Sequence, residues 1–515
     1  MLATATSCGS GRVPDDTLVV LIEMPAISID PRYAITSYDF KIGRVVYAPL
    51  VSTDTQSTDV QMELAESVVP SSTTPDGGND WTVTLRDARF SDGKVVTSDD
   101  IVYTFERLRD PKTGGAAARL RNALRDAGLT DISAPDARHI VFHVTQPYAS
   151  FVSDLNVGIM ERPQPGVKEG PFPIGAGAFS FLKREGETWT FAANPYYFGG
   201  VPKVKRLVFK TIRDDNSRLL ALVGGSGDLT QNTISQLLVD AVAAQPRLKV
   251  PSGRSSVYTY LGVNNEDPIL KDVRVRQALA LAIDRATIVH TTLHDHAVLA
   301  TGMLPTFHWA YSGDVDRYDF DPARAKQLLD AAGYPDPDGD GPLPRFTITL
   351  KSSSNKLRVA IATVVADQLR KIGIGVDLRI YEFATFFVDI KKGNFQLFIM
   401  QIPEIAEPNL YNVFFASNRI PTRDNLDAGG NRVRYRSPKV DQLLEDGRRE
   451  LDRPKRKDIY RQIQQILARD VPVISLWHED NLVVIRKAVD GYKIWPTTSM
   501  SSLAQTGKTA GKTKP

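Results

Sequence analysis

The alternation of apolar and polar positions along the chain predicts strands and helices in turn. The apolar run at residues 17–23 is typical of a buried strand, and the strict alternation of residues 81–86 is typical of a half-buried one. Residues 97–100, Thr-Ser-Asp-Asp, predict a helix start, because Ser or Asp caps a helix and acidic side chains favour its first turn. Further helices are expected at 273–289, 321–332 and 359–370, and a further strand at 374–383. Helices and strands that alternate in this way favour an α/β fold.

The helix expected at 273–289 has one apolar face, on which Leu279, Ile283 and Ile288 recur at helical spacing. Its polar positions, which we expect to face water, are Arg274, Arg276, Asp284 and Arg285.

Composition places the chain among ordinary soluble globular proteins. Its 515 residues are 42% hydrophobic and 24% charged, enough for two or three domains with sizeable cores. The net charge is only +3, without a strong block of either sign, which argues against a nucleic-acid partner or an anionic membrane surface. The sequence contains no run of about 18 apolar residues, the length that would predict a membrane-spanning helix.

The single cysteine, Cys8, excludes an internal disulfide framework and a metal site built from several cysteines. Small residues precede Cys8 and Gly-Ser-Gly follows it, which resembles the end of a bacterial lipoprotein signal and a polar tether. Only seven residues precede Cys8, fewer than a complete signal needs, and Ala5 stands where the pattern prefers leucine. Cys8 is therefore either a lipidation site or an ordinary residue near the chain end.

A series of short motifs in a fixed order resembles the family 5 solute-binding proteins, the dipeptide, oligopeptide and nickel-binding group of bacterial ABC importers. The opening segment is Ser28-Ile29-Asp30-Pro31, with Tyr38 and Val46-Tyr47 after it. The later motifs are WTVTLR (81–86), FSDG (90–93), DDIVYTF (99–105), QPY (146–148), IGAGAF (174–179), NPYY (194–197), LGVNN (261–265), VRVRQAL (273–279) and the segment 321–334. Their order over more than 400 residues makes a chance match improbable.

The resemblance implies a two-lobed clamshell, the type II periplasmic-binding-protein fold, that closes around a ligand. The expected parts are a lipoprotein signal remnant and tether (1–16), lobe I (17–265 and 480–505) with an extra subdomain at about 51–170, lobe II (266–479) and a disordered tail (506–515). The hinge is expected near residues 264–265 and 477–478. A ligand that contacts both lobes favours the closed state.

The resemblance also implies an acidic residue in lobe II that holds the amino terminus of a peptide. Glu404 falls at this place, with Glu407-Pro408 as the acidic-Pro pair that trails it. Peptide binders of the family have aspartate where Glu404 stands and usually tryptophan where Gln401 stands. The carboxylate of this chain therefore reaches further, and the site lacks one aromatic wall. The alternative is that Glu404 is a solvated loop residue.

For the carboxylate of the ligand, dipeptide binders use an arginine just before the 359–370 helix. Lys351 falls near that position and Arg358 opens the helix, and a lysine offers a point charge where an arginine offers a fork. Tyr38 and Trp477 are candidate aromatic walls of the cleft. The alternatives are surface bases for the first pair and core packing for the second.

A histidine cluster offers a different function. His290 and His294 would share one face of a helix, and His296 or Asp295 could add a metal ligand, so a nickel or zinc binder or a metal-dependent envelope enzyme stays open. The motif Asp336-x-Asp338-x-Asp340-Gly opens like a calcium loop, but Thr347 stands where glutamate is required, which favours a plain acidic turn.

Enzyme motifs for a nucleophile elbow, a dinucleotide site, a Walker loop or a zinc protease are missing, so we expect neither catalysis nor a cofactor. The expected partners are a peptide or small-molecule ligand and an ABC permease in the inner membrane, with membrane contact only through a lipid anchor. We expect a monomer in the periplasm or on the outer face of the cell membrane.

Overall fold

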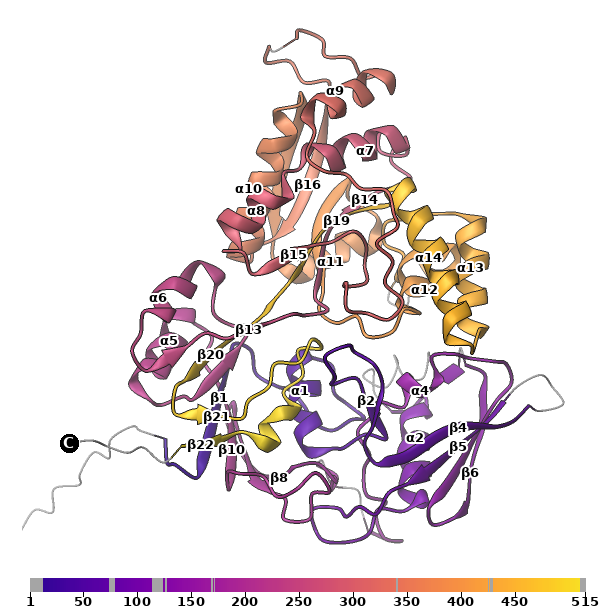
Figure 1. Ribbon diagram of the computed structural model, residues 1–515, viewed down its shortest axis with the longest axis vertical. Coiled ribbons are helices and arrows are strands. Elements are labelled where there is room, and N and C mark those ends of the chain that lie inside the picture. The colour runs from indigo at the N-terminus through magenta and orange to yellow at the C-terminus, as the bar shows by residue number, and fades with distance from the viewer. Residues whose placement is uncertain are drawn as a thin grey trace, which may run out of the picture.

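The chain folds into two lobes, each built around its own β-sheet and drawn one above the other in Figure 1. The computed structural model describes residues 13–73, 79–113, 124–125, 127–167, 170, 172–339, 341–424, 426 and 429–509. The expected two-lobed α/β architecture is confirmed. Of the helices in these ranges, none combines the length and the apolar character that crossing a membrane requires.

Lobe I, the lower lobe, contains the larger sheet. Its strand order is β12 (Leu248–Lys249), β20 (Asn481–Arg486), β11 (Leu229–Gln231), β1 (Thr17–Ile22), β10 (Arg206–Thr211), β9 (Thr188–Ala193) and β8 (Phe179–Glu185), and β13 (Ser252–Gly253) also pairs with β20. The predicted strand at 17–23 is β1, every residue of which is buried, and it runs parallel to β10. The helices of this lobe are α1 (Ser37–Val46), α5 (Asp215–Gly224) and α6 (Val239–Ala243).

A subdomain with its own core extends lobe I. Its sheet has the order β4 (Ala65–Thr73), β5 (Asn79–Leu85), β7 (His139–Val144) and β6 (Leu129–Asp136). The helices α2 (Ser98–Arg109) and α4 (Phe151–Asp154) accompany it. The strand predicted at 81–86 is β5, which shows the expected alternation of burial. The helix predicted from 97–100 is α2, but its N-cap is Thr97 and not Ser or Asp; the Thr97 N–H donates to Asp100 Oδ2 at 2.8 Å.

Lobe II is a six-stranded mixed sheet with helices on both sides. The strand order is β15 (Ala297–Leu299), β19 (Val473–Glu479), β14 (Tyr258–Val263), β18 (Leu397–Ile402), β16 (Phe346–Ser353) and β17 (Ile374–Tyr381). The helices are α7 (Val273–Ala282), α8 (Arg285–Thr292), α9 (Pro322–Ala331), α10 (Lys356–Arg370), α11 (Phe383–Lys392), α12 (Leu410–Phe415), α13 (Pro438–Arg449) and α14 (Arg453–Asp470).

The single helix expected at 273–289 is in fact two helices. Helix α7 ends at Ala282, and Asp284 caps the start of α8 by accepting a hydrogen bond from the Thr287 N–H. Arg276, expected to face water, is buried and donates to four backbone carbonyls, those of Leu270, Lys271, Asp470 and Val471. Arg285 is half-buried and also donates to backbone carbonyls. An arginine can enter a core when carbonyls satisfy its donors, which a periodic pattern does not reveal.

The chain passes between the lobes twice, but not at the first place expected. Strand β14 pairs along its length with β18 and β19 of lobe II, so residues 258–265 belong to lobe II and the first crossing lies at 254–257. The second crossing lies at Asp480, between β19 of lobe II and β20 of lobe I. Register decides this boundary, and it depends on strands distant in sequence.

Both described chain ends are more ordered than expected. Val13, assigned to the tether, is buried and its N–H donates to the Gly225 carbonyl. Within the expected disordered tail, β22 (Gly507–Lys508) pairs with β21 (Val489–Asp490), and the Lys508 ammonium lies 2.8 Å from Asp228. A buried ion pair therefore fixes a segment whose composition resembles a frayed end.

We expect Phe142→Ala to lower the free energy of unfolding of the subdomain by about 3–5 kcal/mol, because the fully buried ring packs against Phe105 and Phe151 and its loss leaves a cavity. Urea denaturation followed by circular dichroism measures this loss. The control is Val95→Ala, at a side chain 53% exposed in the same subdomain, with an expected change within about 0.5 kcal/mol. Equal losses in both variants would contradict a separate subdomain core.

Candidate functional site

Polar residues that follow the strand ends of the two sheets face each other across the junction of the lobes. Glu23 follows the carboxyl end of β1, and the parallel strands β16 and β17 of lobe II end at Ser353 and Tyr381. In open α/β sheets, ligands bind in the crevice outside the carboxyl ends of the strands. Lys356, just beyond β16, interacts electrostatically with Asp214 of lobe I, so these edges face each other.

Charged groups from both lobes meet at this junction. Glu404 lies exposed in the loop between β18 and α12, and its charge acts on Lys41 of α1 in the facing lobe. Burial lowers the pKa of the Lys41 ammonium, and Glu404 and Glu23 oppose that shift. Burial raises the pKa of Glu23, against the opposing charge of Arg218. Two carboxylates and one ammonium group thus share the space between the lobes.

Tyr38, a predicted aromatic wall, lies beneath this charge cluster. The ring is 6% exposed, and the Lys41 Nζ is 5.3 Å from its centroid. Burial, with a contribution from Glu23, raises the pKa of the Tyr38 hydroxyl. Among the described residues, none forms a hydrogen bond or an ion pair within 4 Å with the Lys41 ammonium. Its ammonium is therefore a half-buried cation held by a cation–π contact and more distant charges.

Lys351 and Arg358, the predicted carboxylate-binding residues, are both paired within lobe II. The Lys351 Nζ lies 2.6 Å from Asp389 Oδ2 and 5.2 Å from the Tyr381 ring centroid, and the side chain is buried. The Arg358 guanidinium donates to both carboxylate oxygens of Glu479, at 2.7 and 3.1 Å. Each cation is compensated by a carboxylate of the protein, so neither offers an unpaired charge to a ligand.

Glu479 is the centre of a buried hydrogen-bond cluster next to the second crossing. Its carboxylate accepts from Thr259 Oγ1 at 2.8 Å and from the Trp477 indole N–H at 3.2 Å, besides Arg358. Gln401, expected in the ligand site, donates to Thr259 Oγ1 at 3.4 Å. Burial acts to raise the pKa of Glu479, but Arg358 and the donated hydrogen bonds outweigh it, so the pKa is lowered.

Trp477 does not form an aromatic wall of the cleft, because it is fully buried in the hydrophobic core of lobe II. Its indole N–H holds the Glu479 carboxylate instead. A tryptophan with one polar contact is common in cores, and its position in the sequence does not separate the two roles.

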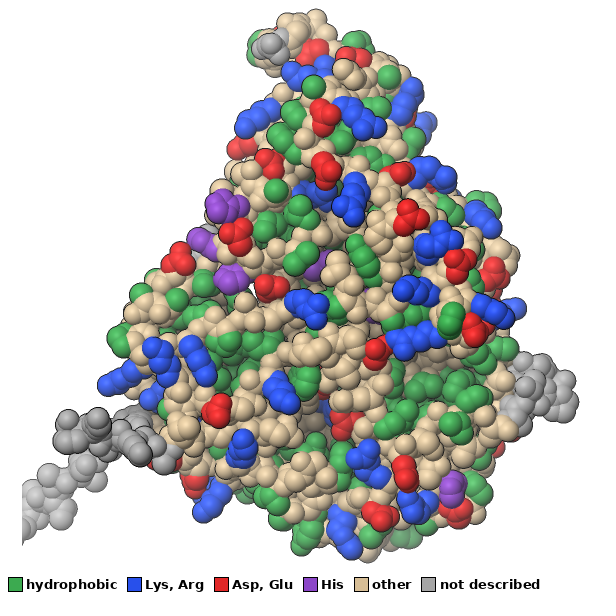
Figure 2. All heavy atoms as spheres, viewed as in Figure 1, with side chains coloured by type: hydrophobic (Ala, Val, Ile, Leu, Met, Phe, Trp, Pro, Cys, Tyr) green, Lys and Arg blue, Asp and Glu red, His purple; other side chains and the backbone are tan. Residues whose placement is uncertain are grey.

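The histidine cluster forms a turn and not one helix face. His290 lies on α8, but His294 and Asp295 have positive φ beyond the helix end, so the i, i+4 geometry is absent. His290 Nδ1 lies 3.1 Å from Asp295, and His294 Nδ1 lies 3.8 Å from Asp240 of α6. His296 interacts with Asp480. Figure 2 shows histidine side chains along this edge, where α8 lies above α6.

In the part of the chain that the structure describes, no three His, Cys, Asp or Glu side chains are grouped so that they could hold a metal ion. In the acidic turn, Asp336 lies 3.5 Å from the Arg345 Nε, and Asp338 accepts from the Leu343 N–H. Asp340 and Cys8 lie outside the described residues.

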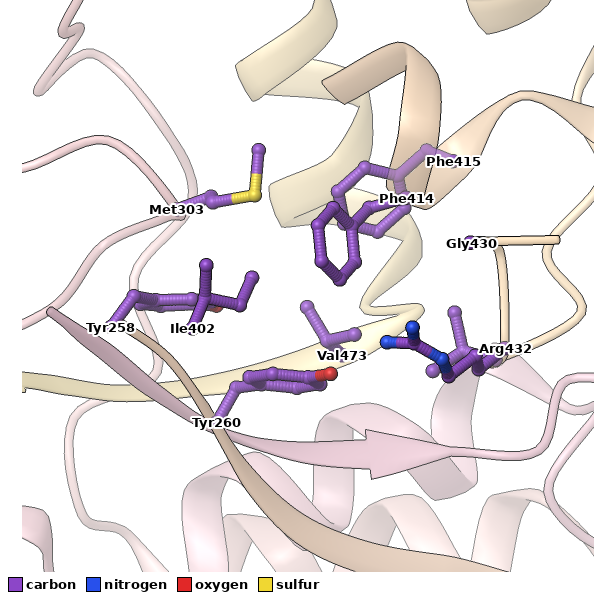
Figure 3. Close-up of a pocket in the computed structure, with 10 residues that line it drawn as sticks. Tyr258, Tyr260, Met303, Ile402, Phe414, Phe415, Gly430, Arg432 and Val473 are labelled. Carbon is purple, nitrogen blue, oxygen red and sulfur yellow. The ribbon is translucent and has the colours of Figure 1, made fainter. Parts of the chain in front are cut away.

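Two cavities lie inside lobe II and not between the lobes. One of about 180 Å³ is bounded by α7, α14 and β19, and a second of about 10 Å³, at the lower limit for one water molecule, lies beside β14. Figure 3 shows the Arg432 guanidinium and the Tyr260 hydroxyl directed at each other in the smaller cavity. Burial raises the pKa of Tyr260 to about 12, with Arg432 opposing. This polar contact forms part of the wall of the smaller cavity.

Sequence reasoning missed Glu23, Lys41 and Glu479. A signal existed for Glu23, since it is the last residue of the predicted buried strand at 17–23 and therefore stands at the carboxyl edge of the sheet. Nothing local distinguishes Lys41 from a solvated lysine. Glu479 becomes central only because β14 and α10 bring Thr259 and Arg358 to it.

Two lobes joined by two crossings, with opposite charges meeting between them, define a solute-binding protein. The comparisons agree and identify the family: the model of bacterial extracellular solute-binding proteins, family 5, matches residues 59–419. This chain belongs to that family.

Similar proteins are known in sequence and structure. The oligopeptide-binding protein AppA from Bacillus subtilis is 28% identical over 96% of this chain and 92% of its own length, and the probable D,D-dipeptide-binding periplasmic protein DdpA from Escherichia coli is 28% identical over 96% and 95%. The AppA structure with a nonapeptide superimposes with a TM-score of 0.76 at 26% identity, covering 96% of this chain and 99% of AppA. NikZ from Campylobacter jejuni, in complex with Ni(L-His), reaches 0.79 at 24% identity, covering 96% and 100%, which shows the shared fold.

Arg358→Met tests the buried cluster through its pH dependence. The variant leaves the Glu479 carboxylate buried without its cation, so we expect a loss of about 3–5 kcal/mol in the free energy of unfolding at pH 7. In the wild type the pKa of Glu479 is below its ordinary 4.5, so the pair stabilises the fold above that pH and loses its effect on acidification. In the variant only the hydrogen bonds from Thr259 and Trp477 oppose burial, so we expect this pKa to be raised and stability to fall as the pH rises through it.

The difference between wild type and Arg358→Met is therefore expected to shrink from pH 7 to pH 4.5, as measured by urea denaturation at several pH values. Combining Arg358→Met with Glu479→Gln removes the buried charge and should make the loss independent of pH. A difference of the same size at both pH values in the single variant would contradict this assignment.

Proposed function

We propose that this protein captures a short peptide or peptide-like solute between its lobes and delivers it to an ABC permease. Family membership and the relatives named as peptide-binding proteins support the ligand class. The observation that carries the proposal is the arrangement of Glu404 and Lys41, opposite charges supplied by facing lobes. A zwitterionic ligand matches such a pair.

Glu404 is proposed to bind the ammonium group of the ligand. It lies on an exposed loop that follows a buried strand, so the strand fixes its position while the carboxylate stays accessible. Closure around the ligand removes water from both charges. A desolvated carboxylate is stabilised only when a cation or hydrogen-bond donors replace the lost water, which selects a ligand with a free ammonium group.

Lys41 is proposed to bind the carboxylate of the ligand, in place of Lys351 and Arg358. Those two cations already hold carboxylates of the protein. Lys41 is half-buried on α1, above Tyr38, and burial already destabilises its charge. An anionic group of the ligand would offset this loss of hydration. A carboxylate therefore stabilises the charged form of Lys41 more than it stabilises a fully solvated lysine.

Closure follows from the same charges. A ligand that contacts Glu404 of lobe II and Lys41 of lobe I interacts fully only when the lobes meet, so it shifts the population toward the closed state. We propose that the permease recognises this closed form. The names of five Brucella relatives, 27% identical over 87% of this chain, also refer to an ABC transporter.

We further propose that the protein works as a monomer outside the cytoplasm, in the periplasm or on the outer face of the membrane, and that Cys8 carries a lipid anchor. The extracellular family and the small residues before Cys8 support this placement.

Glu404→Gln tests ammonium recognition. We expect the affinity for tripeptides with free amino termini to fall by about 2–5 kcal/mol, because the substitution removes the charge that replaces water around the ammonium group. Native mass spectrometry with a tripeptide library and its N-acetylated counterpart measures the preference. Glu266→Gln, at a surface glutamate of the same lobe paired with Arg434, is the matched control. Binding of neither library by the wild type would refute the peptide proposal itself.

Lys41→Met tests carboxylate recognition. Methionine keeps most of the apolar length over Tyr38 and removes the charge, so we expect weaker binding of peptides with a free carboxyl terminus and unchanged binding of their C-terminal amides. Isothermal titration calorimetry on one peptide and its amide gives both affinities. Equal losses for the two ligands would assign Lys41 a role in packing alone.

A further inference from the structure

The subdomain contacts lobe II at a second place, away from the charge cluster. Residues 148–154 lie directly beneath the ends of α13 and α14, on the opposite side of the molecule from the crossings near β13 and β20 (Figure 1). The groups involved come from the segment around α4 in the subdomain and from the Glu407 loop, α13 and α14 in lobe II.

Side-chain hydrogen bonds join the two surfaces around Ser150. The Ser150 hydroxyl donates to Glu407 Oε1 at 3.0 Å and accepts from the Arg456 guanidinium at 3.1 Å. Arg456 also pairs with Glu407, and Ser153 Oγ, which donates to the Ser150 carbonyl at 2.8 Å, lies 3.4 Å from Glu407 Oε2. Ser150 is the N-cap of α4, but its side chain makes no capping bond in its own helix. Its hydroxyl is committed to lobe II instead.

A backbone bond and two further side-chain contacts extend this junction. The Ala149 N–H donates to the Arg448 carbonyl at 2.8 Å, and Asn409 Nδ2 donates to the Tyr148 hydroxyl at 3.3 Å. The Arg448 guanidinium lies 5.7 Å from the Tyr148 ring centroid. Tyr148 and Ser150 are 3% and 1% exposed, although both lie where the subdomain meets another lobe. Such low exposure is typical of side chains in a packed interface, so the two surfaces are in direct contact.

We propose that these contacts form a latch that favours closure of the lobes independently of any ligand. Every group in them belongs to the protein, so they form whenever the lobes meet. They lie opposite the crossings, where opening separates the lobes most. The latch therefore adds a fixed contribution to the closed state, and the ligand adds its own.

The latch also changes apparent affinity. When only a fraction of molecules is closed, the measured dissociation constant is the intrinsic constant divided by that fraction. Glu407 of the latch lies three residues after Glu404, in the same loop between β18 and α12. Closing the latch thus places the residue proposed to bind the ammonium group.

The test is the double variant Ser150→Ala, Ser153→Ala, followed by small-angle X-ray scattering of the protein stripped of ligand by partial unfolding and refolding. Both changes remove hydroxyl groups from the subdomain and leave the Glu407–Arg456 pair in lobe II intact, so folding is preserved. We expect the radius of gyration to increase relative to the wild type. The matched control is Ser98→Ala, at a serine 2% exposed whose hydroxyl donates to the Asp136 carbonyl within the subdomain.

Disulfide trapping provides a second measurement. Ala149→Cys with Arg448→Cys, in a Cys8→Ser background, places two thiols where a backbone hydrogen bond joins the lobes. We expect the disulfide to form in ligand-stripped protein and to form on the order of tenfold more slowly when Ser150 and Ser153 are replaced, as hydrogen bonds to a charged group imply. Unchanged scattering together with an unchanged trapping rate would overturn the latch.

Because both measurements use protein without ligand, they are independent of the proposed peptide function. A latch that fails these tests leaves the binding site intact, and a protein that binds no peptide can still close. The two proposals can therefore be rejected separately.

Discussion

The rest of the structure depends on the hydrogen bonds that the buried Glu479 carboxylate accepts. Glu479 is the last residue of β19, directly before the second crossing, and it receives hydrogen bonds from Arg358, Thr259 and Trp477. The Ser255 hydroxyl in the first crossing donates to the Glu479 carbonyl. One residue therefore links both crossings to the sheet and to α10 of lobe II. A rigid anchor of this kind confines lobe movement to the few residues between the sheets.

Charge compensation distinguishes Lys351 and Arg358 from Lys41, the cation proposed to bind the ligand. Lys351 and Arg358 each meet a carboxylate inside lobe II, where the low dielectric strengthens the pair and makes its loss costly. Lys41 faces Glu404 across the lobe junction and has a lowered pKa. The half-buried charge without a close partner is the one that a ligand can stabilise further.

Closure in this molecule draws on two sets of contacts with different chemistry. The charge cluster of Glu404 and Lys41 suits a ligand, whereas the latch around Ser150 and Glu407 uses only protein groups. The two sets meet in one short loop after β18. In a peptide binder with such a loop, contacts within the protein already favour the closed state, and the ligand contributes the remaining free energy of closure. Changes in these contacts would alter the apparent affinity while the ligand site stays the same.

The sequence by itself determined the α/β class, the strands β1 and β5, a helix start within residues 97–100 and the family, because periodicity, capping and ordered motifs are local properties. It also offered an exposed loop as the alternative to a ligand-binding role for Glu404. The tertiary structure alone decided that the first crossing precedes β14, that Arg276 and Trp477 are buried, and that Lys41 and not Lys351 faces the opposite lobe. These outcomes depend on strand register and on partners more than a hundred residues away in sequence. Neither can be read from the local pattern of apolar and polar residues.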